Sequence, residues 1–318
     1  MRFPALVATA LLTLSPLTAM AAPLSVSVSI IPQQWLIKQL GQDSVDVQTM
    51  VLPGQEPEDF SPSPRQLSSL SHSRLYFSIG VPFEAAWLDR FAERAPDMNI
   101  VSMDKNVAHR SIESHDEPSH HDGEAHNDHH AHDDHHHGHE AASGHHHEAG
   151  APDPHIWLDP NNMIIMAHNA ADALVNALPD QAGAIRQRES ALVDEIKQTD
   201  QQITRQLMPY KGRSFMVYHP AWGYFADHYH LNQHPIELNG REPTPRALHD
   251  LMTTARKNGI HTIFVQKQFS QATARRLAES LDGNVVSIDP LAEDYPANLH
   301  RIADALVAGF EKATDSSS

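Results

Sequence analysis

Residues 181–207 read QAGAIRQRESALVDEIKQTDQQITRQL and follow a helix-breaking pair, Pro179-Asp180. We interpret this run as one helix of about 27 residues, which would be roughly 40 Å long at 1.5 Å per residue. Such a helix is longer than a small domain needs. The sequence therefore predicts a rigid connector at 181–208 between two lobes, one on each side.

On the N-terminal side, short apolar segments alternate with helical ones. Strands are predicted at 24–30, 45–51, 75–79 and 99–103. Helices are predicted at 33–40, 64–71, 83–95 and 161–177. Strands that alternate with helices indicate βα units and a mostly parallel sheet. This half predicts an N-terminal α/β lobe at 23–178.

The same rhythm returns after the long helix. Strands are predicted at 214–218, 233–238, 261–265 and 284–288. Helices are predicted at 221–229, 246–258, 271–281 and 295–312. We therefore expect an α/β protein with a second lobe at 211–315, each lobe a mostly parallel sheet flanked by helices.

The first residues predict export from the cell. Met1-Arg2-Phe3 precedes an uncharged apolar run, and Ala19-Met20-Ala21 supplies a cleavage site, so residues 1–22 have the form of a secretory signal peptide cut after Ala21 or Ala22. The chain has no cysteine, which excludes disulfides and a lipid anchor at the cleavage site. We expect a soluble periplasmic protein.

A histidine-rich stretch lies before the motif Asp153-Pro154-His155. Fifteen of the 25 histidines fall between His109 and His147, and acidic residues are frequent among them. Because the stretch offers almost no apolar side chain to bury, we expect a disordered loop at about 109–150. A merely solvated loop is the alternative, but neutral imidazole is a common metal ligand. The expected low-affinity metal ligands are His120, His121, His126, His129, His130, His132, His135, His136, His137, His139, His145, His146 and His147.

The charge and the motif content exclude several functions. A formal net charge of −17 argues against nucleic-acid binding and suits a protein that attracts cations. The sequence has no H-E-x-x-H helix, no Ser-His-Asp arrangement and no paired carboxylates with a spare base. We therefore expect a protein that is not an enzyme.

Four candidate metal ligands each stand beside a proline: Glu58, His155, His219 and Asp289. At least three follow a predicted strand, where open α/β sheets place their ligand sites. Proline stiffens such joints, which suits a preformed site for a divalent transition ion. Each residue also has a simpler reading alone: Asp289 as a helix cap, Glu58 as a solvated acid, and a histidine as a hydrogen-bonded turn residue.

These motifs resemble the periplasmic metal-binding proteins of zinc and manganese ABC importers over nearly the whole mature chain. The matching stretches are Pro53–Pro64, Asp153–Pro160, Tyr218–Phe225, Glu242–Pro245 and Asp289–Leu291. The resemblance implies two α/β lobes bridged by a long helix, with the metal in the cleft between them. A histidine-rich acidic loop before the second ligand is typical of the zinc branch.

The first ligand loop departs from that family, because Glu58 stands where the family usually has a histidine. Three arrangements remain open: Glu58 binds the ion, a water completes the site without it, or the histidine-rich loop lends a ligand. We favour Glu58 as a direct ligand. We favour Zn²⁺ over Mn²⁺ because His219 keeps a nitrogen donor at a position where the resemblance implies a carboxylate in the manganese branch.

The expected function is a periplasmic receptor that binds Zn²⁺ tightly and delivers it to an inner-membrane ABC permease. A metal buffer or chaperone without a permease is the alternative, as is the same role with manganese. The protein is expected to be a monomer, with a periplasmic metallochaperone as a further partner. His228, near a helix end, is interpreted as a residue that favours the helix dipole.

Overall fold

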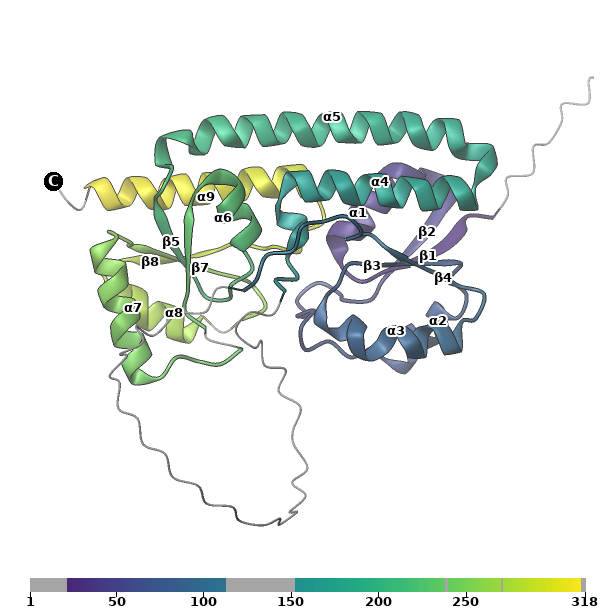
Figure 1. The fold of residues 1–318 in the computed structure, drawn as a ribbon. Coiled ribbons are helices and arrows are strands. Elements are labelled where there is room, and N and C mark those ends of the chain that lie inside the picture. The colour runs from purple at the N-terminus through teal and green to yellow at the C-terminus, as the bar shows by residue number, and fades with distance from the viewer. Residues whose placement is uncertain (1–21, 113–151, 238–239, 270, 316–318) are drawn as a thin grey trace, which may run out of the picture.

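The computed structural model describes residues 22–112, 152–237, 240–269 and 271–315, and these form two α/β lobes (Figure 1). The predicted signal peptide, apart from Ala22, and the thirteen predicted loop ligands lie outside these residues. Each lobe has one four-stranded sheet, and every strand pair within it is parallel. The predicted fold class is confirmed, with sheets that are fully rather than mostly parallel.

The N-terminal sheet has the strand order β2-β1-β3-β4. Its strands are β1 (Leu24–Val28), β2 (Val45–Thr49), β3 (Leu75–Ser78) and β4 (Asn99–Ser102). Its helices are α1 (Ile31–Gly41), α2 (Pro64–Leu70), α3 (Pro82–Arg94) and α4 (Pro160–Ala177). In Figure 1, α1 and α4 lie on one face of the sheet and α2 and α3 on the other, so both faces are covered.

The C-terminal sheet repeats this topology with the order β6-β5-β7-β8. Its strands are β5 (Ser214–Val217), β6 (Asn232–Pro235), β7 (Thr262–Val265) and β8 (Asn284–Ser287). Its helices are α6 (Gly223–Tyr229), α7 (Pro245–Lys257), α8 (Ala272–Glu279) and α9 (Tyr295–Asp315). Because all strands of a sheet run the same way, the loops that follow them gather at one edge of each lobe.

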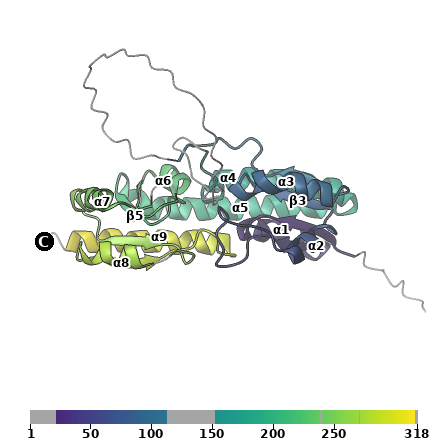
Figure 2. The same ribbon diagram turned by 90° about the horizontal axis from the view of Figure 1, so that it is seen from below.

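The long helix α5 (Ala182–Leu207) spans both lobes, as predicted. It packs on α4 of the first lobe and on α9 of the second, and the lobes lie end to end along it (Figure 2). Its buried stripe includes Ile185, Leu192, Ile196 and Ile203. These apolar contacts with both lobes make α5 a packed strut rather than a free linker.

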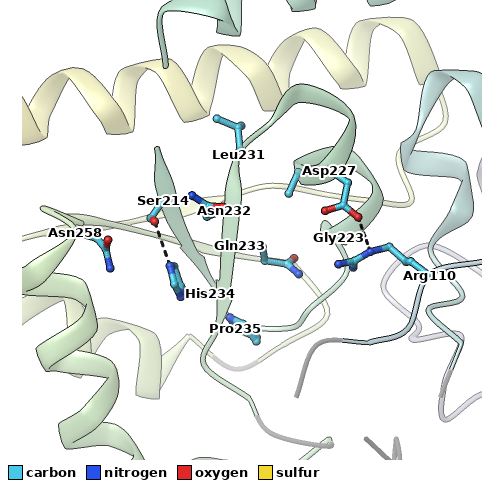
Figure 3. Close-up of a pocket in the computed structure, with 11 residues that line it drawn as sticks. Arg110, Ser214, Gly223, Asp227, Leu231, Asn232, Gln233, His234, Pro235 and Asn258 are labelled. Carbon is cyan, nitrogen blue, oxygen red and sulfur yellow. Dashed lines mark hydrogen bonds and ion pairs between the residues drawn. The ribbon is translucent and has the colours of Figure 1, made fainter. Parts of the chain in front are cut away.

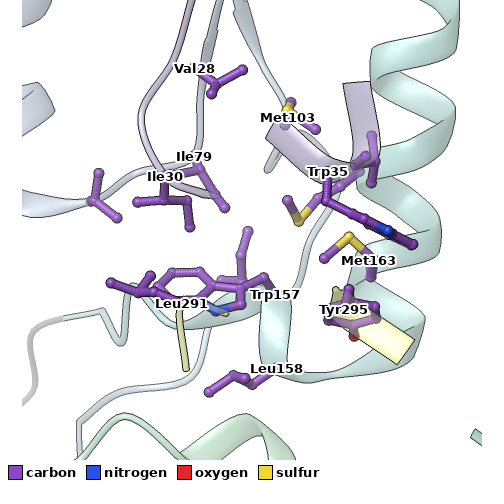
Figure 4. Packing of buried hydrophobic residues seen from close by; sticks show 14 of the residues in the cluster. Val28, Ile30, Trp35, Ile79, Met103, Trp157, Leu158, Met163, Leu291 and Tyr295 are labelled. Atoms are coloured by element: carbon purple, nitrogen blue, oxygen red, sulfur yellow. The ribbon is translucent and has the colours of Figure 1, made fainter. Parts of the chain in front are cut away.

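The two lobes also share an apolar core beside the predicted ligand His155. Trp157 lies against Leu291 and near Tyr295 of the second lobe (Figure 4), and its indole N–H donates to the carbonyl of Pro290 at 2.9 Å. One continuous cluster of buried apolar residues includes members of both lobes. Truncation of a buried Trp typically costs about 3–5 kcal/mol, so this contact adds to the stability of the junction between the lobes.

Most predicted segments agree with the structure to within one to three residues at their ends. Helices α2, α3, α4 and α7 begin at a proline, whose missing N–H is not needed in the first turn. Short 3-10 turns lie at Gln42–Ser44, Ile156–Leu158, Pro179–Gln181 and Met208–Tyr210. Among the described residues, none of the helices has both the length and the apolar character needed to span a bilayer.

Candidate metal centre

Three of the four predicted ligands converge between the lobes. Glu58 lies on the loop after β2, His155 immediately precedes the 3-10 turn Ile156–Leu158, and His219 follows β5. They are 8%, 4% and 1% exposed, respectively. Two of the three thus come from loops at the carboxyl ends of strands, as the parallel topology requires.

Their donor atoms already stand at distances that suit a bound metal. His155 Nε2 and His219 Nε2 are 3.4 Å apart, His219 Nε2 is 3.2 Å from Glu58 Oε1, and His155 Nε2 is 3.9 Å from that oxygen. Zinc bonds of about 2.0–2.1 Å in a tetrahedron would separate neighbouring donors by about 3.3 Å. Two edges of the triangle match this value, and a small movement of Glu58 would shorten the third.

A buried carboxylate holds the far side of the His155 ring. Asp153 Oδ1 lies 2.8 Å from His155 Nδ1 and also accepts the backbone N–H of His155 at 3.0 Å. Burial alone would raise the pKa of Asp153, but the hydrogen bond and charge of His155, together with Arg110, lower it. A carboxylate at Nδ1 leaves Nε2 as the free ligand atom and fixes the ring orientation.

His219 is held in the same way by a residue from another segment. Glu237 Oε1 lies 3.0 Å from His219 Nδ1, and the ring of Phe269 stacks on the imidazole with centroids 4.9 Å apart. Burial lowers the pKa of His219, but the charges and hydrogen bonds of Glu58 and Glu237 raise it well above its usual value. A metal must therefore displace a proton from this ring in order to bind.

Glu56 is an acidic group beside the centre that the sequence did not single out. It is half-buried, and its carboxyl interacts electrostatically with His219, Glu58 and Glu237. Burial and the neighbouring carboxylates raise its pKa to about 7, while His219 lowers it. A cation in the centre would favour the charged form of Glu56, so this group adds negative potential where the metal binds.

The fourth predicted ligand, Asp289, is not one of these mutually close donors. Its Oδ1 accepts the backbone N–H of Leu291 at 2.9 Å, and its Oδ2 lies 3.9 Å from Lys267 Nζ. Asp289 is on the loop after β8 and lines a pocket of about 290 Å³ with Lys267. Its role as a ligand stays a prediction, as does any contribution from the thirteen loop histidines.

His228 was interpreted from the sequence as a residue that favours the helix dipole. The structure shows instead that it pairs with two carboxylates. Its Nδ1 lies 3.1 Å from Asp159 Oδ1 and its Nε2 lies 2.7 Å from Asp200 Oδ1. Burial lowers the pKa of His228, but these two carboxylates raise it to about 9. Since Asp159 precedes α4 and Asp200 is on α5, a charged His228 on α6 ties three elements together.

The centre has two imidazoles and one carboxylate, each from a different loop. This donor set fits a divalent transition ion with a fourth position for Asp289 or a water. The carboxylates behind both rings complete the arrangement that usually orients metal-binding histidines. The chemistry of the site is therefore that of ion capture between two lobes.

Comparison with known proteins identifies the family of this chain. Residues 26–309 match the family model described as zinc-uptake complex component A, periplasmic. The crystal structure of ZnuA has 28% sequence identity and a TM-score of 0.77 over 90% of this chain and 99% of that one. The structure of a zinc-bound deletion mutant of ZnuA has 28% sequence identity and a TM-score of 0.76. The match covers 90% of this chain and 98% of that one.

A putative metal-binding protein of Chlamydia muridarum is 26% identical over 281 residues, which are 88% of this chain and 89% of that protein. The zinc-binding protein AdcA of Streptococcus pyogenes is 28% identical over 258 residues, which are 79% of this chain but 47% of AdcA, so the chain spans about half of that relative. The family match covers most of the chain and confirms the resemblance seen in the sequence motifs. The chain belongs to the periplasmic zinc-uptake component A family of metal-binding solute receptors.

Proposed function

We propose that this protein is the substrate-binding component of a zinc ABC importer, and that it carries Zn²⁺ to a permease in the inner membrane. The observation that supports this most directly is the triangle of Glu58, His155 and His219, whose donor atoms have nearly tetrahedral spacing.

The donor types favour zinc over manganese. Two imidazole nitrogens suit Zn²⁺, whereas Mn²⁺ is bound best by sites made largely of oxygen. The zinc-bound structure of the ZnuA deletion mutant and the zinc-binding protein AdcA point the same way. Asp289, which would add an oxygen, is the proposed fourth ligand, and manganese remains the alternative cargo.

A test of zinc delivery to a permease distinguishes an importer component from a metal buffer. The zinc-loaded protein should stimulate zinc uptake by proteoliposomes that contain its partner ABC permease. The His155→Ala/His219→Ala variant, which keeps the surface but loses the centre, should not. If wild type binds zinc tightly but gives no more uptake than free zinc at the same concentration, the protein is a buffer or chaperone instead.

The histidine-rich segment is proposed to capture further ions at lower affinity. Because Glu58, His155 and His219 lie outside this segment and offer three mutually close donor atoms, deletion of residues 113–148 should leave one tight zinc site and remove the weaker binding events. A linker of equal length without histidine is the matched control for the effect of shortening. Loss of the tight site in both variants would mean that the segment supplies a core ligand.

The proposed location follows from the family and from the first residues. We propose that residues 1–22 are removed on export and that the mature monomer, with lobes at 23–178 and 211–315 joined by 181–208, works in the periplasm without a lipid anchor. Mass spectrometry of protein from the periplasmic fraction would test this. A mass that includes residues 1–21 would contradict the cleavage.

A further inference from the structure

Arg110 lies where the two lobes meet, just behind the metal centre. Its Nη1 donates to Asp153 Oδ2 at 2.9 Å. Its Nε donates to Asp227 Oδ2 of α6 at 2.8 Å (Figure 3). The side chain of Arg110 is only 15% exposed, and that of Asp153 is 1% exposed. The guanidinium therefore joins a buried carboxylate of the first lobe to a helix of the second.

The backbone of Arg110 takes part in the same junction. Its N–H donates to the hydroxyl of Tyr224 at 3.0 Å, and its carbonyl accepts the N–H of Asp153 at 2.8 Å. Its guanidinium carbon lies 5.8 Å from the centre of the Tyr224 ring. The contacts of Arg110 thus fix its position from both sides of the junction.

Gly223 provides a second, independent sign that this junction is built for a guanidinium. A Cβ atom at position 223 would come within 1.4 Å of Arg110 Nη1 and 2.8 Å of Asp153 Oδ2. Gly223 is the first residue of α6, where a residue with a side chain is ordinarily accepted. The absent side chain leaves the space that the guanidinium occupies.

These contacts connect both metal-binding histidines. Asp153 Oδ1 holds the His155 ring while Asp153 Oδ2 is held by Arg110. Helix α6 begins four residues after His219. Arg110 therefore links the support of His155 to the helix that directly follows His219.

We propose that Arg110 is a positioning residue that holds His155 and His219 at metal-binding separation before the ion arrives. The proposal rests on the proposed metal-binding function of the centre. Arg110 touches neither the ion nor its donor atoms, and it acts through Asp153 and α6. Loss of the tie lets the lobes sample wider separations, and only the fraction of molecules with the donors together binds tightly.

The test measures lobe spacing and zinc affinity in the same variants. Because the chain has no cysteine, Glu93→Cys on α3 and Asp250→Cys on α7 place one spin label on each lobe, at exposed positions. Pulsed EPR of the metal-free protein should give a narrow distance distribution in wild type. It should give a broader one in Arg110→Met, which narrows again when zinc is added.

Zinc affinity should fall roughly ten- to hundredfold in Arg110→Met, as is typical when a supporting partner of a ligand is lost. Gly223→Ala should have the same effect, because it displaces the guanidinium without removing its charge. Asp227→Asn, which removes only the partner on α6, should have a smaller effect. Arg186→Met is the matched control, since Arg186 pairs with Asp172 and Glu189 away from the centre.

A wild-type distance distribution in both Arg110→Met and Gly223→Ala would overturn the proposal, whatever happens to affinity. If Arg110→Met fails to fold, Gly223→Ala and Asp227→Asn decide by the same criterion. If the wild-type protein binds no zinc, the proposed function is wrong. The spin-label distances of the metal-free variants would still show whether Arg110 holds the lobes together.

Discussion

His155 and His219 lie 64 residues apart in the chain, yet their Nε2 atoms are 3.4 Å apart between the lobes. Each ring is held from behind by a carboxylate, Asp153 for the first and Glu237 for the second. The shared core at Trp157 and the packing of α5 on both lobes keep the two loops in register. The two loops thus direct both nitrogens toward the same point between the lobes.

Replacement of Glu58 tests the departure from the usual family histidine. Glu58→Ala should weaken zinc binding by more than the roughly 10–100-fold typical of a supporting residue, because it removes a donor. Glu58→His should keep tight zinc binding and weaken manganese binding, because imidazole suits zinc better. Competition titrations with both metals measure this. Asp59→Asn, an exposed neighbour on the same loop, is the control; unchanged zinc affinity in Glu58→Ala would exclude Glu58 as a ligand.

Glu237→Gln should lower zinc affinity about 10–100-fold, because the amide no longer supplies a negative charge behind His219. Because glutamine has nearly the size of glutamate, the fold should stay intact. Thermal unfolding of the metal-free protein checks this. Glu242→Gln, a change of the same kind on the following segment, should leave the affinity unaltered. If both variants bind zinc as tightly as wild type does, Glu237 has no part in the centre.

The His228 tie predicts how stability depends on pH. Its folded pKa of about 9 exceeds the ordinary value of 6.5, so its contribution is fully present below about pH 6.5 and is lost as pH rises through about 9. The shift corresponds to at most about 3 kcal/mol. Denaturant unfolding of the metal-free protein should show this loss between pH 6 and pH 10.

In His228→Gln the free energy of unfolding should be lower at pH 6 and should vary less with pH, so that the difference from wild type shrinks by pH 10. The comparison with wild type isolates the contribution of His228 from those of other titrating groups. His249→Gln, which changes an exposed histidine on α7, should follow wild type. A constant difference between His228→Gln and wild type across the pH range would disprove the charged tie.

Asp289→Asn separates a ligand from a turn residue. The amide oxygen can still accept the N–H of Leu291, so the turn should persist while the anionic donor is lost. If Asp289 joins the ion as the fourth ligand, zinc affinity falls and stability hardly changes. Lys267→Ala is the companion variant and should leave zinc binding intact or tighten it, since Lys267 lies near the same carboxylate. Lower stability with full zinc affinity in Asp289→Asn would make it a turn residue only.

The sequence predicted the two lobes well because local periodicity and proline placement determine where strands and helices begin. His155 and His219 could be selected as candidates because each stands beside a proline at a loop, and the structure brings them close together. Glu237 could not be found this way, because its contact with His219 joins two separate segments of the lobe. The contact of Arg110 with Asp227 and the ion pairs of His228 could not be predicted either, because they form only when the lobes and α5 come together.

One zinc ion is expected to bind between Glu58, His155 and His219. Isothermal titration of the metal-free mature protein with Zn²⁺, followed by Mn²⁺ competition, tests it most directly, with the His155→Ala/His219→Ala variant alongside. We predict one tight zinc event that manganese does not displace and that the variant lacks. A tight event that survives in the variant, or tight manganese binding with only weak zinc binding, would contradict the account.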